Sequence, residues 1–265
     1  MSTVGVTSAA DAARDPRRPQ QRYGRIVVVG GGCYGGYYVR QLHRAERAGA
    51  ITWEELVVVD RDPACAVSVL DADDRPPRLG LIVAGWDEFF GRYLPTVADG
   101  DQHLADAIVP SPLMPHLMAD WLLARARERW PERTVQIAPI AELPSIPWQR
   151  SGDDGTRYVS FAEWICPINC IEPARCPETR GPRSWSLPVA LTHPSPAGER
   201  PASAAFPLLF HCTHRAYGVG MIDVRDVIQA DATIAARGAA GEAAFLVGTV
   251  SHCHGALRCI TIGSP

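Results

Sequence analysis

Lysine is absent from this sequence. All 26 basic residues are arginine. Without a lysine amine, the chain cannot form a Schiff base with a carbonyl substrate, hold nucleotide phosphates with a P-loop lysine, or use lysine as a catalytic base. The composition alone therefore excludes several large enzyme classes.

Clustered positive charge and long apolar runs are also missing. The formal net charge is −3, and the arginines form no basic stripe of the kind that attracts nucleic-acid phosphates. A membrane-spanning helix needs a run of about 18 apolar residues, and the sequence has none. We therefore predict neither a nucleic-acid partner nor a membrane partner.

The first residues lack the apolar core of a secretory signal, and we predict a disordered leader over residues 1–22. We expect the protein to be cytoplasmic, a compartment in which its eight cysteines would stay reduced. A dense group of reduced cysteines indicates metal or redox chemistry more than disulfide bonds.

A buried strand and a glycine-rich turn follow the predicted leader. Residues 25–30, RIVVVG, form the continuous apolar run that is typical of a strand buried on both faces. Gly30, Gly32 and Gly35 then fit G-x-G-x-x-G, and a helical pattern continues over 37–49. In this motif the three glycines allow a tight turn, close approach of a pyrophosphate, and close packing of the helix on the strand.

A second apolar strand, residues 56–60, ends at Asp60, whose carboxylate could accept hydrogen bonds from ribose hydroxyls. Asp60 favours NAD, and the neighbouring Arg61 keeps NADP open. This segment resembles the Rossmann-fold NAD(P)-binding superfamily, closely over 24–60 and by pattern alone as far as residue 140. The resemblance implies a bound NAD(P). A turn that holds S-adenosylmethionine, or no nucleotide, stays an alternative.

The alternation of strands and helices continues, and it predicts an α/β fold with a doubly wound, parallel, Rossmann-like sheet over residues 23–140. The elements that we expect after Asp60 are strands at 79–85, 106–111 and 134–140 and a helix at 115–130.

The middle of the chain, residues 141–205, is rich in proline. Twelve of the 23 prolines lie between residues 139 and 207. Because proline lacks a backbone N–H and fixes φ, we predict an irregular segment here, without long helices or a central strand. A bound metal is one way to order such a segment.

Three cysteines in this segment are candidate metal ligands. Cys166, Cys170 and Cys176 have the spacing C-x3-C-x5-C, and proline follows the outer two. The Cys-Pro pairs resemble ferredoxin-type loops in style, although the spacing matches no standard zinc or iron–sulfur motif. Thiolates on an irregular loop can surround one metal centre, but a fourth ligand is then needed.

The last region, residues 206–265, is predicted to contain a βαβ unit. Strands at 206–211 and 244–251 flank a helix at 222–238, and such strands are parallel. This unit either extends the first sheet or forms a separate lobe, and the sequence leaves both open.

Both strands of this unit end in histidine and cysteine residues. The carboxyl ends of parallel strands share one edge of a sheet, where α/β folds bind ligands. Cys212 and Cys253 are the candidates for the fourth metal ligand. His214, His252 and His254 are the candidates for proton transfer, because imidazole titrates near neutral pH.

These features predict an NAD(P)-dependent oxidoreductase with a metal or iron–sulfur site, acting on a small molecule or a redox partner protein. Zinc and an iron–sulfur cluster both suit the ligands. A non-catalytic nucleotide- and metal-binding sensor is the main alternative. A ubiquitin-activating-like adenylating enzyme is a third, which the missing lysine disfavours.

Overall fold

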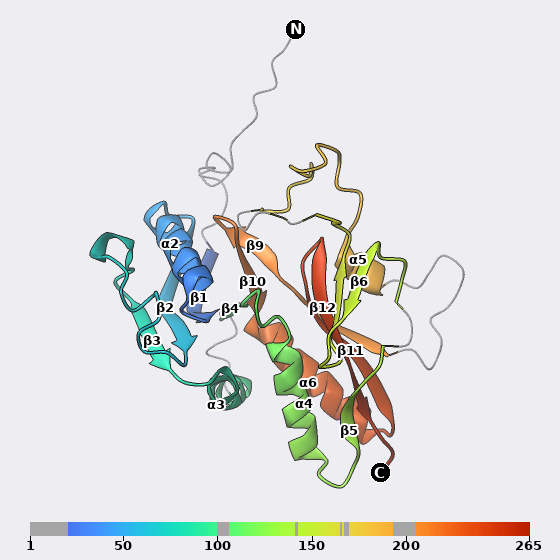
Figure 1. The fold of residues 1–265 in the computed structure, drawn as a ribbon. Helices are drawn as coiled ribbons and strands as arrows, with labels where there is room; N and C mark the ends of the chain where they lie inside the picture. Colours follow the sequence, from blue (N-terminus) through green and yellow to red (C-terminus); the bar gives the residue numbers. More distant parts are fainter. Residues whose placement is uncertain (1–20, 100–105, 141–142, 165, 167–169, 193–204) are drawn as a thin grey trace.

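The computed structural model describes residues 21–265 except 100–105, 141–142, 165, 167–169 and 193–204. Residues 1–20 of the leader predicted over 1–22 lie outside the described residues, and the prediction is wrong for residues 21 and 22, which begin the strand Gln21–Val29. The protein is a mixed α/β fold with two mixed β-sheets (Figure 1). No helix in the described parts of the chain is long and apolar enough to cross a membrane.

The first sheet has the strand order β3-β2-β1-β4-β10-β9. Its first four strands are parallel, and the hairpin of β9 and β10 joins antiparallel to β4. The strands are β1 (Gln21–Val29), β2 (Ile51–Asp60), β3 (Leu79–Val83), β4 (Ala107–Val109), β9 (Thr213–Ala216) and β10 (Val219–Asp223). The sheet is therefore mixed, whereas a purely parallel sheet was predicted.

Helices cover both faces of this sheet, because alternate residues of a strand point in opposite directions. Ile26 and Val28 of β1 pack with α2, whereas Val27 and Val29 belong to the core that contains α3, α4 and α6. The helical elements are α2 (Cys33–Arg47), α3 (Trp86–Ala98), α4 (Leu117–Arg129), α5 (Leu187–Thr192), α6 (Val224–Ala239) and the 3-10 helix η1 (Ala72–Asp74).

The second sheet has the order β6-β7-β12-β11-β8, and β5 also pairs with β12. Only β8 and β11 are parallel among its described strand pairs. Its strands are β5 (Val135–Ala138), β6 (Trp148–Ser151), β7 (Arg157–Ser160), β8 (Phe206–His211), β11 (Ala243–Val250) and β12 (His254–Ile262).

Two predictions about the middle of the chain are wrong. The strand expected at 134–140 does not continue the first sheet, because β5 pairs antiparallel with β12 in the second. The segment 141–205 does contain an interior strand, since β7 pairs with both β6 and β12. The prolines fall outside β6 and β7, so the backbone N–H groups of these strands remain available for the ladder.

The C-terminal βαβ unit is confirmed in part. β8 and β11 are parallel, with His211 opposite Val250, but they belong to the second sheet and do not extend the first. Between β8 and α6 the chain forms the β9–β10 hairpin, which crosses into the first sheet. One hydrophobic core joins α4 and α6 to residues of both sheets, including Phe210 and Phe245 of the second.

Candidate functional site

The glycine turn joins β1 to α2. Gly30 has φ of +85°, in the left-handed region that favours glycine. A Cβ added to Gly35 would lie 1.9 Å from the carbonyl oxygen of Gly30, so the helix packs directly on the turn. A Cβ added to Gly32 would meet no described atom within 4 Å. The turn thus has a tight bend, a closely packed helix and open space at its middle glycine.

Asp60 is anchored beside this turn. One oxygen of its carboxylate accepts a hydrogen bond from the backbone N–H of Gly31 at 2.6 Å, and the other accepts one from the N–H of Asp62 at 2.9 Å. Cys33, the first residue of α2, is exposed. The helix N-terminus, the carboxylate and the open face of the turn therefore lie together at the ends of β1 and β2.

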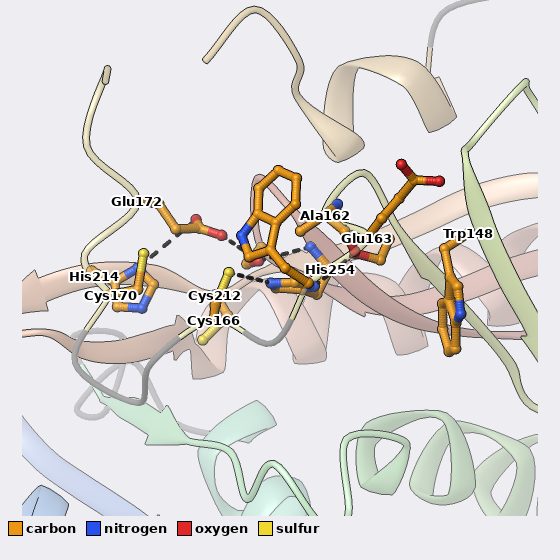
Figure 2. A pocket seen from close by; sticks show the side chains of 12 residues that line it. Trp148, Ala162, Glu163, Cys166, Cys170, Glu172, Cys212, His214 and His254 are labelled. Atoms are coloured by element: carbon orange, nitrogen blue, oxygen red, sulfur yellow. Dashed lines mark hydrogen bonds and ion pairs between the residues drawn. The ribbon is translucent and has the colours of Figure 1, made fainter. Parts of the chain in front are cut away.

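A cavity of about 570 Å³ lies between the cysteine-rich loop, the hairpin and the β11–β12 turn (Figure 2). We call it the Cys/His cavity. Its described lining residues are Trp148, Ser160, Ala162, Glu163, Trp164, Cys166, Cys170, Glu172, Cys212, His214, Ser251 and His254. Five of the residues singled out from the sequence are therefore gathered here: Cys166, Cys170, Cys212, His214 and His254.

His254 is held between a hydroxyl and a thiol. The hydroxyl of Ser160 donates to the carbonyl oxygen of Ala162 at 2.6 Å, which uses its only proton. His254 Nδ1, 2.9 Å from the same hydroxyl oxygen, must then carry the hydrogen of that contact. Nε2 is left as an unprotonated nitrogen, and it lies 3.3 Å from Cys166 Sγ.

Burial keeps this thiol and imidazole uncharged. It raises the pKa of Cys166 to about 11, and the neighbouring Cys170 adds to the rise. Burial likewise lowers the pKa of His254 below its usual value. The resting pair is therefore a neutral thiol facing a neutral imidazole, which is not the charged pair of an activated nucleophile.

Glu172 also lines the cavity, and the sequence analysis did not single it out. Its side chain is 6% exposed. It accepts hydrogen bonds from the Ser251 hydroxyl at 2.6 Å and from the backbone N–H groups of His252 at 3.0 Å and Cys253 at 3.1 Å. Burial would raise the pKa of Glu172, but these bonds hold it below its usual value. A buried carboxylate is thus kept ionised.

His214 and Cys212 come to the cavity from the hairpin side. His214 Nδ1 lies 3.9 Å from the Glu172 carboxylate. A Cβ added to Gly220 on β10 would lie 2.6 Å from Cys212 Sγ, so the glycine makes room for the thiol. Burial raises the pKa of Cys212 to about 12.

Two of the predicted metal ligands, Cys176 and Cys253, are not among the described lining residues. Cys253 is buried, and its sulfur accepts a hydrogen bond from the indole N–H of Trp185 at 3.2 Å. Cys176 is buried in a turn of its own, in which the Cys176 N–H donates to the Gly181 carbonyl oxygen at 2.9 Å. A hydrogen bond from the Thr179 N–H lowers the pKa of Cys176.

His252, a predicted proton-transfer residue, also lies outside the described lining. Its Nδ1 is 3.3 Å from the Ser186 hydroxyl, and its ring meets that of His211 edge to face at 4.8 Å between centroids. Within the described parts of the chain, no group of three or more His, Cys, Asp or Glu side chains is arranged to hold a metal ion.

The hairpin connects the two regions. Ala216 and Met221 of the hairpin share a core with Tyr38 of α2. Burial raises the pKa of Tyr38 to about 12, and the nearby Cys212 contributes to the rise. The helix that follows the glycine turn therefore packs against the hairpin that carries His214.

A protein-family model described as "Uncharacterized protein, C-terminal domain" matches residues 118–263, more than half of the chain. No curated protein and no solved structure matches the chain significantly. The matched region contains every described residue that lines the Cys/His cavity, whereas the glycine turn precedes it.

Proposed function

The chain belongs to the family described as "Uncharacterized protein, C-terminal domain", and from this premise we propose that it is an NAD(P)-binding oxidoreductase whose reaction takes place in the Cys/His cavity. One observation carries the proposal. Three thiols and two imidazoles from separate parts of the chain line a single cavity next to an ionised, buried carboxylate. Such a set suits proton transfer, metal binding and redox chemistry.

The first sheet supports a dinucleotide site. We propose that its parallel strands form a Rossmann-like, doubly wound unit, in which ligands bind at the carboxyl edge where the strand order reverses. The order β3-β2-β1-β4 puts that reversal between β1 and β4. The glycine turn follows β1, and its open face at Gly32 leaves space for a pyrophosphate.

The same edge leads to the Cys/His cavity. β10 runs antiparallel to β4 with Ile222 opposite Ile108, so Val219 and the turn of the hairpin extend beyond the carboxyl end of β4. The glycine turn also follows the carboxyl end of its strand. A nicotinamide that leaves the glycine turn in the direction of β4 would therefore approach the hairpin that carries His214.

The reaction would move a hydride, with its electron pair, from NAD(P)H to an electrophilic carbon of the substrate, or in the reverse direction. A proton must accompany it. His214, 3.9 Å from the ionised Glu172, is the group that we assign to proton transfer. A metal ion or iron–sulfur cluster held by the cavity thiols would supply substrate polarisation or electron relay.

Nucleotide binding by a Gly32→Val variant tests the proposal. The wild type should bind NADH or NADPH, measured by titration calorimetry, and the variant should lose this binding because its side chain fills the space for the pyrophosphate. Gly91→Val is the matched control, since a Cβ at Gly91 on α3 also meets no described atom within 4 Å. Gly91→Val should bind like the wild type.

Turnover is measured with the same proteins by the loss of NAD(P)H absorbance in the presence of a panel of small substrates. Wild-type protein that binds neither nucleotide, or equal binding by Gly32→Val, would contradict the proposal. Binding without turnover of any substrate would favour a nucleotide-binding sensor over an enzyme.

A further inference from the structure

The cysteines near the cavity fall into two groups. Cys166, Cys170 and Cys212 line the cavity, whereas the thiols of Cys176 and Cys253 have hydrogen-bond partners elsewhere. Sequence spacing alone grouped Cys166, Cys170 and Cys176 as one ligand set. The structure separates the third cysteine from the other two and brings a histidine to the first.

The sequence indicated Cys253 as a metal ligand and His254 as a proton-transfer group, but of the two only His254 lines the cavity. His254 is the first residue of β12, and Cys253 lies in the turn just before it. Cys253 faces Trp185, whose N–H it accepts, while His254 faces the cavity and Cys166 (Figure 2). The histidine, not the cysteine, therefore presents a free electron pair to the cavity.

The distance between Cys166 Sγ and His254 Nε2 is close to that expected between two ligands of one ion. Bonds of about 2.3 Å to sulfur and about 2.0 Å to nitrogen, at a tetrahedral angle, place the two atoms roughly 3.5 Å apart. The observed separation is 3.3 Å. The Ser160 hydroxyl contacts Nδ1 of His254 and fixes the ring, as hydrogen-bond acceptors do for metal-ligating histidines.

The charge and composition of the lining favour a cation. Its described residues include thiols, imidazoles and the carboxylates of Glu163 and Glu172, but no arginine. Cys170 lines the same cavity as Cys166. Two thiolates would bring further negative charge, which a bound divalent ion offsets.

We infer that the Cys/His cavity binds one zinc-type divalent ion through Cys166, Cys170 and His254, with the fourth position open to the cavity. Two thiolates and one imidazole with an open position are a known catalytic arrangement for zinc. These three side chains are not grouped as a metal site in the described structure, so Cys170 would have to turn towards the Cys166–His254 pair when the ion binds.

This inference rests on the proposed function and names its substrate class. An ion with an open position polarises an oxygen, so the substrate would be an aldehyde or ketone, or the corresponding alcohol. In the reducing direction the hydride joins the carbonyl carbon, the proton joins the oxygen, and NAD(P)H becomes NAD(P)⁺. The cavity is large enough for a small organic molecule, and the Trp148 and Trp164 indoles line it.

Zinc binding by cysteine and histidine variants tests the inference. Zinc is titrated into the metal-free, reduced protein in competition with a chromophoric chelator. We expect one ion per chain for the wild type. Cys166→Ser, Cys170→Ser and His254→Gln should each lower the affinity at least tenfold. X-ray absorption of the zinc complex should show two sulfur ligands and one nitrogen from the protein.

Cys253→Ser and Cys176→Ser are the matched controls, because both replace a buried thiol next to the site with the same smaller side chain. They should bind zinc like the wild type. Circular dichroism and thermal unfolding of all variants report whether the chain is folded, without using the metal site or the nucleotide site. Zinc binding that survives in Cys166→Ser or His254→Gln, or is lost in Cys253→Ser, would overturn the inference, as would a wild type that binds no zinc.

The two proposals fail separately. Zinc bound with the expected pattern by a chain that binds no nucleotide would contradict the oxidoreductase and leave the ion site in place. Nucleotide binding and turnover without stoichiometric zinc would remove the ion site and leave the oxidoreductase.

Discussion

The glycine turn and the Cys/His cavity are built by different means. The turn is a backbone structure: Gly35 packs on the carbonyl oxygen of Gly30, and Asp60 holds the N–H of Gly31. The cavity is a side-chain structure, in which a buried carboxylate, Glu172, is held by a hydroxyl and two backbone N–H groups. Added volume should therefore damage the turn, whereas the cavity depends on the chemical identity of its groups.

The turn would select its ligand by shape, whereas the cavity would act on its ligand chemically. The turn offers N–H groups and space, and any pyrophosphate of the right size could use them. The cavity offers soft donors and a proton-transfer group that act on particular atoms of a substrate. The hairpin couples the two, because one side of it packs on α2 and the other carries His214. The following changes, taken in order of expected effect on stability, test this contrast.

Gly35→Ala should have the largest effect. The added Cβ would lie 1.9 Å from the carbonyl oxygen of Gly30, and backbone atoms cannot move aside cheaply. We expect a loss of about 3 kcal/mol in the free energy of unfolding, measured by urea denaturation. A loss below about 1 kcal/mol would show that the turn is not held by backbone contact.

Asp223→Asn tests the stability of the hairpin that connects the two regions. Arg215 on β9 donates to both oxygens of Asp223, at 2.6 and 2.8 Å. Removing the charge leaves a half-buried guanidinium without its ion pair, and we expect a loss of about 2 kcal/mol at pH 7. Glu88→Gln, which breaks an exposed pair on α3, is the control and should change stability little.

The same pair should give a pH signature. Hydrogen bonds from Arg215 hold the pKa of Asp223 below its usual value. The stabilisation is then fully present above pH 4, near the unfolded-state pKa of about 3.9. It is lost as pH falls through the lower, folded-state pKa. Unfolding of the wild type should therefore become easier towards pH 2 by more than that of Asp223→Asn. Parallel pH profiles would contradict the ion pair.

Gly220→Ala should have an intermediate effect that a second change reverses. Its Cβ would lie 2.6 Å from Cys212 Sγ, and we expect a loss of about 1.5 kcal/mol. In the double variant Gly220→Ala, Cys212→Ala the sulfur is absent, so the penalty of the first change should largely disappear. A penalty that is the same in both backgrounds would mean that the glycine does not serve the thiol.

Gly32→Val should have the smallest effect on stability. The new side chain meets no described atom at its Cβ, and the cost is limited to a poorer N-cap for α2, about 0.5 kcal/mol. Thermal unfolding measures it directly. The comparison with Gly35→Ala is the sharpest test of the turn, because two glycines three residues apart should differ severalfold in stability cost.

Local patterns were sufficient for the first strands and helices. The run RIVVVG, the three glycines and the strand that ends at Asp60 predicted β1, α2 and β2, because each of these elements is specified by neighbouring residues. The parallel pairing of β8 and β11 was predicted from the order of strand, helix and strand along the chain. β12, α3 and the β9–β10 hairpin were missed, and the short hairpin has no period long enough to recognise.

The candidate site could be predicted only in part from such local patterns. Cysteine spacing placed Cys166, Cys170 and Cys176 together, but the turn around Cys176 removes it from the cavity lining. Glu172 carried no local signal, since a charged residue in a proline-rich loop is expected to be solvated. Its partners Ser251 and Cys253 lie about eighty residues away along the chain.

The sequence by itself determined which chemistry is possible: glycines that bend a turn, the absence of lysine, and cysteines and histidines at the ends of strands. Only the tertiary structure decided which of these groups meet. The physical reason is that turns and strands follow from contacts between near neighbours, whereas a buried carboxylate or an oriented imidazole depends on partners from other strands. The crossing of the chain between the two sheets at Cys212 adds that thiol and His214 to the cavity lining.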